Sequence, residues 1–189
     1  MRITLRNASA ALCFGLLSIA CQAAGGSSVP SAARAAAAPR TLTWEELIPQ
    51  GWHPMDEFKD TDVSMLDDSD PRAMAMLERL QTIYRSAPVN AALDDTLVRL
   101  PGYIVPLEEN QGKISEFLLV PYYGACIHTP PPPANQIVHV MPDRPAPFAS
   151  MDTVWITGRI HARKTDSSMA VSGYDMSAAS VIPYVEERK

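Results

Sequence analysis

One loop of this sequence combines residue types that could do chemistry. Cys126 and His128 are separated by one residue, and four prolines follow them: Pro130, Pro131, Pro132 and Pro133. Proline fixes φ and pushes the residue before it toward extended backbone, so we expect an extended chain around 126–128. The two side chains would then share one face, with Cα atoms roughly 6.5–7 Å apart at a rise of about 3.3 Å per residue. A thiolate and an imidazole so placed could share one metal ion, or the imidazole could take the thiol proton.

A zinc site is one interpretation of this pair. Tetrahedral zinc needs three or four protein ligands, so further ligands must come from elsewhere in the chain. His139 is the nearest candidate in the sequence, followed by His161 and His53. The metal ligands that we predict are therefore Cys126, His128 and His139.

Two other interpretations of the loop stay open. Cys126 could be the nucleophile of a thiol enzyme with a histidine as base. The sequence offers no orienting residue beyond Asn135 and no resolving cysteine, so we assign no catalytic residue and favour a binding role over an enzyme. Alternatively, Cys126 packs as a buried thiol and the stiff loop binds a partner protein through residues on both sides of the cysteine. Those residues are Tyr122, Tyr123, the four prolines 130–133, Asn135 and Gln136.

The N-terminus predicts export. Residues 1–20 contain two arginines, then an apolar stretch that closes on small residues, as a secretory signal peptide does. Ser18-Ile19-Ala20-Cys21 resembles a lipobox, although Ser18 stands where leucine is usual, and it predicts lipidation of Cys21. Ordinary cleavage without lipid is the alternative. Residues 21–41 are rich in Ala, Ser, Gly and Pro and predict a flexible tether. We therefore expect a periplasmic protein, anchored to the membrane if Cys21 is modified.

The cysteines and the net charge limit which disulfide and which binding partners the protein can have. Cys13 leaves with the signal peptide, so Cys126 is the one thiol of the predicted folded domain. A disulfide with Cys21 is possible if no lipid is attached. Loss of the two arginines of residues 1–20 changes the formal charge from −5 to −5 − 2 = −7. Such an acidic protein has no broad electrostatic attraction for nucleic acid, so we expect no nucleic-acid partner.

Residues 42–189 predict a single folded domain, helical over 42–87 and β-rich over 88–186. Thr43 and Glu46 fit a capping box at the start of a short helix. Asp70 and Pro71 suit the start of a longer helix, whose apolar residues recur at helical spacing. We expect that helix to pack its apolar face on the β-rich part.

The β-rich part predicts five to six short strands. They span 96–107, broken or bulged at Pro101-Gly102, and then 114–122, 136–141, 154–161, 169–174 and 181–185. Gly158, inside the fourth, indicates a bulge of the kind that closes small barrels. The predicted fold class is mainly β (α+β): a small OB-like β-barrel with N-terminal helices packed on it. A β-sandwich is the alternative.

Much of this pattern resembles an uncharacterised bacterial domain family of exported proteins and lipoproteins. The matching residues are Leu100-Pro101-Gly102-Tyr103, Pro106-Leu107, Phe117-Leu118-Leu119-Val120-Pro121-Tyr122, the loop Gly124-Ala125-Cys126-Ile127-His128-Thr129-Pro130-Pro131-Pro132-Pro133-Ala134-Asn135-Gln136, Val154-Trp155-Ile156-Thr157-Gly158, Gly173-Tyr174, Trp44-Glu45-Glu46-Leu47 and Gly51-Trp52. The resemblance implies a periplasmic accessory protein, because some relatives resemble components of operons with ABC-type permeases, several linked to zinc supply. It thus implies zinc as cofactor and a membrane permease complex as partner.

Overall fold

The computed structural model describes residues 38–60, 67, 70–126 and 131–185. The predicted signal peptide, Cys21, most of the tether, His128 and Pro130 lie outside these residues. Residues Ala36–Lys189 form one compact unit. No helix within the described residues is long and apolar enough to cross a membrane.

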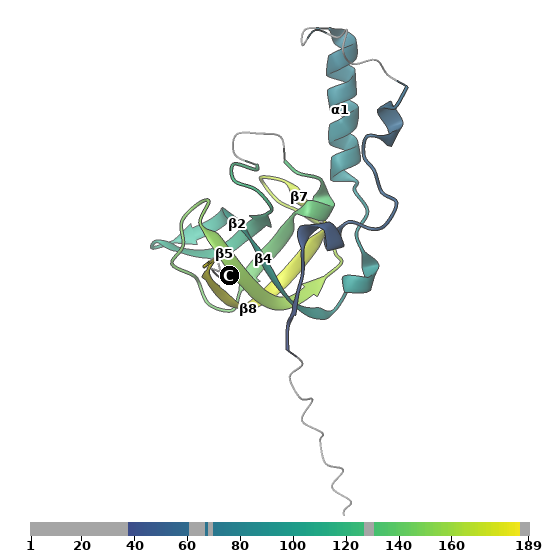
Figure 1. Cartoon of the computed structure of the whole chain (residues 1–189). Helices are drawn as coiled ribbons and strands as arrows, with labels where there is room; N and C mark the ends of the chain where they lie inside the picture. The colour runs from purple at the N-terminus through teal and green to yellow at the C-terminus, as the bar shows by residue number, and fades with distance from the viewer. Residues whose placement is uncertain (1–37, 61–66, 68–69, 127–130, 186–189) are drawn as a thin grey trace, which may run out of the picture. The chain divides into compact units, whose positions relative to one another are not determined.

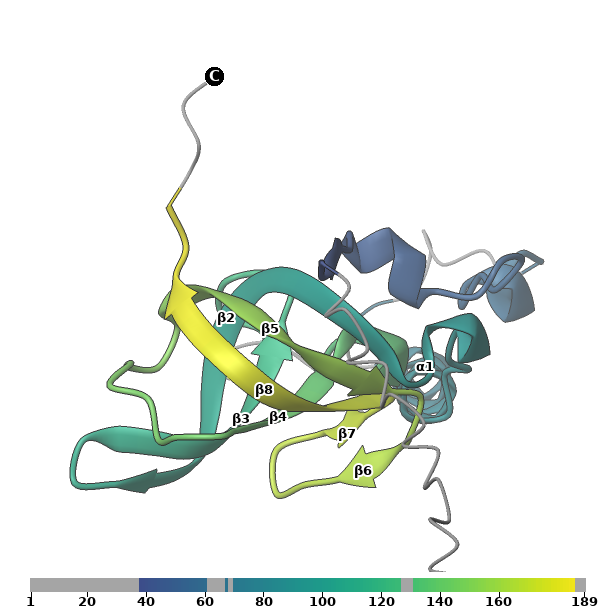
Figure 2. The same ribbon diagram turned by 90° about the horizontal axis from the view of Figure 1, so that it is seen from below.

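Five strands close into a barrel, as Figures 1 and 2 show. They are β2 (Thr96–Asn110), β3 (Lys113–Val120), β4 (Val138–Pro142), β5 (Thr153–His161) and β8 (Tyr174–Pro183). The order is β2-β3-β4-β8-β5, and pairing of β5 with β2 closes the ring. The β4–β8 pair is parallel and the other pairs in the ring are antiparallel. The small OB-like β-barrel that the sequence predicts is confirmed.

A sixth strand extends the edge of the barrel. β1 (Arg40–Thr41) pairs in parallel with Val98 and Arg99 of β2. From Tyr103 onward, β2 pairs with β3 instead. The last two residues of the predicted tether are therefore part of the sheet.

The barrel interior is filled by alternate residues of each strand. In β5, Val154, Ile156 and Ile160 are buried and join the main core, while Trp155 and Thr157 are only partly covered. This alternation is the two-residue period of a β-strand. The main core in this interior contains buried residues such as Leu100, Ile104, Phe117 and Tyr174.

A second apolar cluster lies apart from this core. β3 is buried on both faces: Phe117 and Leu119 belong to the main core, whereas Leu118 and Val120 belong to the second cluster. Ala125 from the loop after β3 and Ala170 from the turn between β6 (Thr165–Asp166) and β7 (Val171–Ser172) join that cluster. The loop and the β6–β7 hairpin thus cover the outer face of β3.

Three strand predictions need correction. β2 runs through Pro101-Gly102 without a break, and its register shifts lie at Pro106/Glu108 and Glu108/Glu109 instead. The predicted strand 169–174 is divided between β7 and the start of β8, and β8 reaches from Tyr174 to Pro183 where the sequence predicts strand only from 181. The bulge predicted at Gly158 is confirmed, since the register of β5 with β8 shifts between Thr157 and Gly158.

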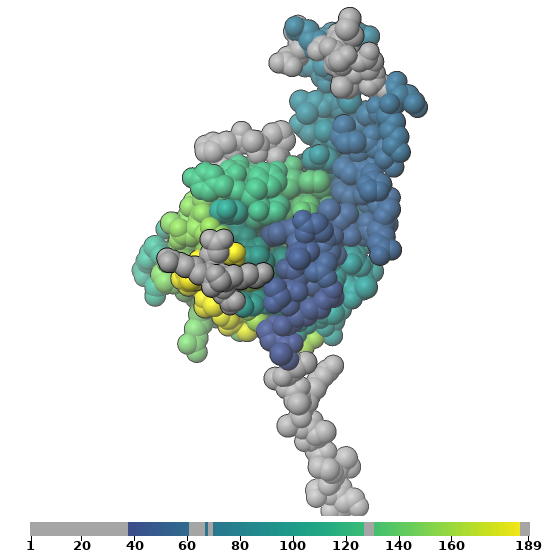
Figure 3. Space-filling view, viewed as in Figure 1, coloured from purple at the N-terminus to yellow at the C-terminus, as the bar shows by residue number. Residues whose placement is uncertain are grey.

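The first N-terminal helix packs on the barrel, as the dark blue surface in Figure 3 shows. This 3₁₀ helix, η1 (Trp44–Leu47), begins with the predicted capping box, in which the Thr43 amide donates to Glu46 Oε2 over 2.8 Å. Leu47 is fully buried in the main core. The buried hydroxyl of Tyr174 donates to the Leu47 carbonyl and accepts from the Asn90 amide, both at 2.6 Å. Burial raises the pKa of this phenol to about 12, and the two hydrogen bonds connect the N-terminal segment to the barrel.

The second helix differs from its prediction. α1 (Pro71–Arg85) starts as expected, with the Asp70 carboxylate accepting from the Arg72 amide and Pro71 at the first position. None of its side chains is buried, however, so the cover that we expected from its apolar face is not formed. Beside α1 runs the segment that contains η2 (Asp56–Phe58), and Arg79 Nε on α1 lies 2.5 Å from Glu57 Oε1 there. Two further 3₁₀ helices among the described residues, η4 (Ala91–Leu93) and η5 (Ala134–Gln136), are short connections.

Candidate functional site

The loop after β3 turns sharply before it reaches the cysteine. Gly124 has φ +82°, and its amide donates to Met151 Sδ at 3.2 Å. Cys126 has φ +66°, a left-handed conformation that is uncommon for a residue other than glycine. The extended backbone predicted at Cys126 is therefore wrong. The prediction took account of the prolines that follow but not of the turn that precedes the cysteine.

Cys126 packs against the second apolar cluster. Its side chain is partly buried beside residues that include Val105, Leu118 and Ile137. Burial in these surroundings raises the pKa of the thiol to about 11. Burial thus disfavours the thiolate, which is the reactive form of a nucleophilic cysteine.

His139 is engaged with a carboxylate on the neighbouring strand. It lies on β4 beside Leu118 of β3 and Asp175 of β8, and it is 6% exposed. Its Nε2 atom is 2.6 Å from Glu116 Oε1, and Asp175 accepts from Arg163 Nε at 2.5 Å. Both carboxylates thus have partners within the chain.

The other candidate ligands are dispersed. His161 Nδ1 lies 3.6 Å from Asp94 Oδ1, and His53 is exposed. Within the described part of the chain, no three His, Cys, Asp or Glu side chains come close enough together to hold a metal ion. His128 lies outside that part. The described donors therefore do not by themselves fit a zinc ion, and the set Cys126, His128 and His139 stays a prediction.

The second half of the loop is fixed to the barrel. The Ala134 carbonyl accepts from the Gly173 amide at 2.6 Å, and a Cβ on Gly173 would lie only 2.7 Å from that carbonyl oxygen. Asn135 is fully buried, and its amide nitrogen donates to the Pro88 carbonyl, while its Oδ1 has no partner among the described residues. Gln136 Nε2 donates to the Trp44 carbonyl at 2.7 Å. Asn135 and Gln136, predicted to contact a partner, therefore make contacts inside the chain.

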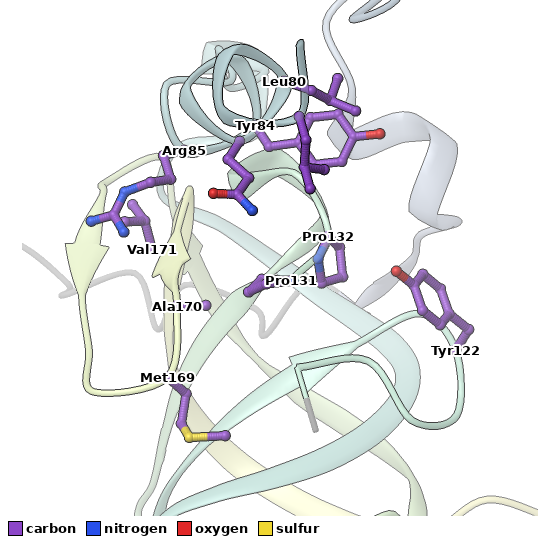
Figure 4. A pocket seen from close by; sticks show the side chains of 11 residues that line it. Leu80, Tyr84, Arg85, Tyr122, Pro131, Pro132, Met169, Ala170 and Val171 are labelled. Atoms are coloured by element: carbon purple, nitrogen blue, oxygen red, sulfur yellow. The ribbon is translucent and has the colours of Figure 1, made fainter. Parts of the chain in front are cut away.

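Between the loop, α1 and the hairpin lies an open apolar pocket of about 550 Å³. Figure 4 shows Leu80, Tyr84 and Arg85 of α1 on one side of the pocket, while Tyr122, Pro131 and Pro132 of the loop and Met169, Ala170 and Val171 of the hairpin line the rest. Leu77 and Gln81 complete the lining. We call this the α1–loop pocket. Its size is in the range of ligand-binding cavities.

The pocket brings together residues that sequence reasoning kept apart. Tyr122 and the prolines were predicted to form a partner surface, and Tyr122 is 47% exposed at the pocket. Tyr123 is 71% exposed, and its ring meets that of Tyr103 edge-on with centroids 6.0 Å apart. The sequence pattern did not predict that residues of α1 and Met169 would line this pocket. The apolar stripe of α1 is the sequence signal for its contribution, but such a stripe fits packing on the barrel equally well.

Comparisons with known proteins identify relatives. The family described as "Protein of unknown function (DUF3299)" matches residues 44–183. The crystal structure of a DUF3299 family protein from Pseudomonas aeruginosa PAO1 is 39% identical, covers 80% of this chain and 99% of that one, and superposes with a TM-score of 0.62. No curated protein matches the chain.

Proposed function

This chain belongs to the DUF3299 family, a family of unknown function, and we propose that it is a binding protein whose α1–loop pocket docks an apolar segment of a partner polypeptide. The observation that carries the proposal is the pocket itself. Its walls come from three separate parts of the chain and are apolar, yet Leu77 is 50% exposed and Met169 is 39% exposed. Exposed apolar side chains gathered around a concave surface are typical of interaction sites.

The chemistry of the lining supports binding rather than catalysis. The ionisable groups among the lining residues are Arg85, Tyr84 and Tyr122. Arg85 lies 3.5 Å from Asp166, and partial burial raises the pKa of Tyr122. None of the three is a general base at neutral pH. Burial raises the pKa of the nearby Cys126 thiol to about 11, which supports the interpretation of a packed thiol rather than a nucleophile.

The location and partner of the protein are part of the same proposal. Residues 1–21 have the pattern of an exported and lipidated protein, which would place the pocket in the periplasm near a membrane. The family resemblance implies a membrane permease complex as the class of partner. We propose that the protein is an accessory component of such a complex.

The test is affinity isolation of the tagged protein from the cells that produce it, with matched variants. Leu77→Asp places a charge in the pocket. Ile182→Asp places the same charge on β8, where isoleucine is 46% exposed and outside the pocket lining. The proposal expects one partner to be retained by wild type, Ile182→Asp and Cys126→Ala and lost from Leu77→Asp and Tyr122→Ala. Retention by all variants, or a partner lost only from Cys126→Ala, would contradict it.

Zinc binding has a separate test. The interpretation based on Cys126, His128 and His139 expects stoichiometric zinc in protein that has been reconstituted and dialysed. It also expects that Cys126→Ser or His128→Ala removes that zinc. Elemental analysis without zinc in the wild type would eliminate this interpretation and leave the docking proposal untouched.

A further inference from the structure

The apolar surface continues beyond the α1–loop pocket along the helix. A second hollow of about 460 Å³ is lined by Pro71, Met74, Ala75, Leu77, Glu78 and Gln81. It shares Leu77 and Gln81 with the first pocket. Met74 and Leu77 are 63% and 50% exposed, so the strip between the two hollows is open. α1 has 15 residues, and at about 1.5 Å per residue it offers a strip of roughly 22 Å.

Along this strip, the arginines of α1 have ion-pair partners within the described part of the chain, whereas its carboxylate has none. Arg72 Nη2 lies 2.8 Å from Asp70, Arg79 Nε 2.5 Å from Glu57, and Arg85 Nη2 3.5 Å from Asp166. Every cation of the helix thus has a carboxylate within the chain. Glu78, the one carboxylate of α1, makes no ion pair within the described part of the chain, and it lines the second hollow.

We infer that the segment docked on α1 is an amphipathic helix with basic residues beside its apolar face, an inference that rests on the proposed function. Its apolar side chains would fill the strip between Met74 and Tyr84, as in helix-in-groove recognition. A lysine or arginine at its edge would pair with Glu78. Charge complementarity of this kind selects partners and orients them.

Two other occupants agree less well with these charges. Residue 78 is the midpoint of α1, so a symmetric antiparallel pair of helices centred there would bring Glu78 close to its own copy. The repulsion between these two carboxylates would oppose pairing of the helices. An anionic lipid surface would meet an unpaired carboxylate on a chain with a formal charge of −5. A basic polypeptide segment avoids both conflicts.

The experiment uses two designed helical peptides of equal length with the same leucine stripe. One carries lysines beside the stripe and the other carries glutamates. Fluorescence anisotropy measures their binding to the purified full chain as wild type, Glu78→Gln and Glu78→Lys. The wild type is expected to bind the lysine peptide about three- to fivefold more tightly, in keeping with an exposed ion pair. Glu78→Gln should abolish this preference and Glu78→Lys should reverse it, while Leu77→Asp should weaken both peptides.

Several results would overturn the inference. They are equal affinity of the wild type for both peptides, a preference unchanged in Glu78→Lys, or no saturable binding of either peptide. Flotation with phosphatidylglycerol vesicles, or reversible dimerisation in sedimentation that Leu77→Asp abolishes, would identify a different occupant and also overturn it. The affinity isolation described above is independent of peptide charge. A partner found there together with no charge preference here would reject this inference alone.

Discussion

The barrel and the α1–loop pocket differ in the solvent exposure of their apolar side chains. The barrel encloses them: Leu100, Ile104 and Ile156 are 0% exposed and surrounded by paired strands. Around the pocket, Leu77, Tyr122 and Met169 are between 39% and 50% exposed, and Met74 in the adjoining hollow is 63% exposed. A folded chain gains free energy when it covers apolar surface, at about 25 cal/mol per Å². The docking proposal rests on this contrast between the enclosed apolar side chains of the barrel and the open ones gathered around a concave surface.

The two regions also differ in their tolerance of change. Close packing ties each barrel residue to fixed neighbours, so changes of volume there are costly. The residues of α1 have few such neighbours. Stability should therefore depend on the barrel and binding on the pocket, and substitutions can separate the two.

The largest effect is expected at the bulge that closes the barrel. A Cβ on Gly158 would lie 2.3 Å from the Ser177 carbonyl oxygen and 2.9 Å from Ala178 Cα. We expect Gly158→Val to cost about 3 kcal/mol or more of unfolding free energy, because backbone must move. The control is Gly112→Ala, where no atom lies within 4 Å and only the positive φ is strained. Denaturant unfolding with equal losses for both variants would refute the role of Gly158.

The same substitution, leucine to alanine, can be made in the barrel core and on α1 to compare how much each region contributes to stability. Leu100→Ala in the core should cost about 3 kcal/mol, because it removes buried methyl groups and leaves a cavity. Leu77→Ala on α1 should change the unfolding free energy by less than about 0.5 kcal/mol, as for exposed sites. Thermal and chemical unfolding measure both. A loss at Leu77 as large as at Leu100 would mean that α1 is part of the core.

Tyr174 tests the connection between the N-terminal segment and the barrel. Tyr174→Phe removes the hydrogen bonds to the Leu47 carbonyl and from the Asn90 amide. We expect a loss of about 2 kcal/mol, since both backbone groups are left without this partner. Tyr123→Phe, at a residue 71% exposed, should unfold as wild type does. Hydrogen exchange should show faster exchange of η1 amides in the Tyr174 variant, and unchanged exchange would count against the connection.

The smallest effect concerns Cys126 and pH. Burial raises its pKa from the usual value of 9.0 to about 11, so the folded state favours the neutral thiol. That contribution to stability is complete below pH 9 and is lost as the pH rises through 11. The wild type should therefore lose more unfolding free energy between pH 8 and pH 10.5 than Cys126→Ala does. Identical pH profiles, or iodoacetamide labelling at pH 7.5 as fast as that of free cysteine, would contradict a packed, protonated thiol.

Local signals in the sequence predicted the elements well. Asp70 and Pro71 determine the start of α1 through contacts within the first turn, and the alternation in β5 follows directly from strand geometry. Gly158 indicated the bulge correctly, whereas Gly102, also inside a strand, lies in regular pairing and packs closely against Leu119. The OB-like barrel followed from the number, spacing and bends of such strands.

Non-local information was harder to obtain from the sequence. The apolar stripe of α1 predicts an amphipathic helix but not which surface, if any, covers it. The contact of His139 with Glu116 depends on the register of β3 and β4, which are separated in the sequence by the loop that contains Cys126. The left-handed turn at Cys126 depends on Gly124 and Met151, which no proline pattern reveals.

Site-specific photo-crosslinking in the producing cells tests the central claim most directly. A photoreactive amino acid is placed at Leu77 in the pocket and, in a second strain, at Ile182 on β8. If the α1–loop pocket is the docking surface, Leu77 forms a discrete crosslink to another polypeptide and Ile182 does not. A crosslink from Ile182 alone, or none from Leu77 while the tagged protein still isolates a partner, would contradict the account.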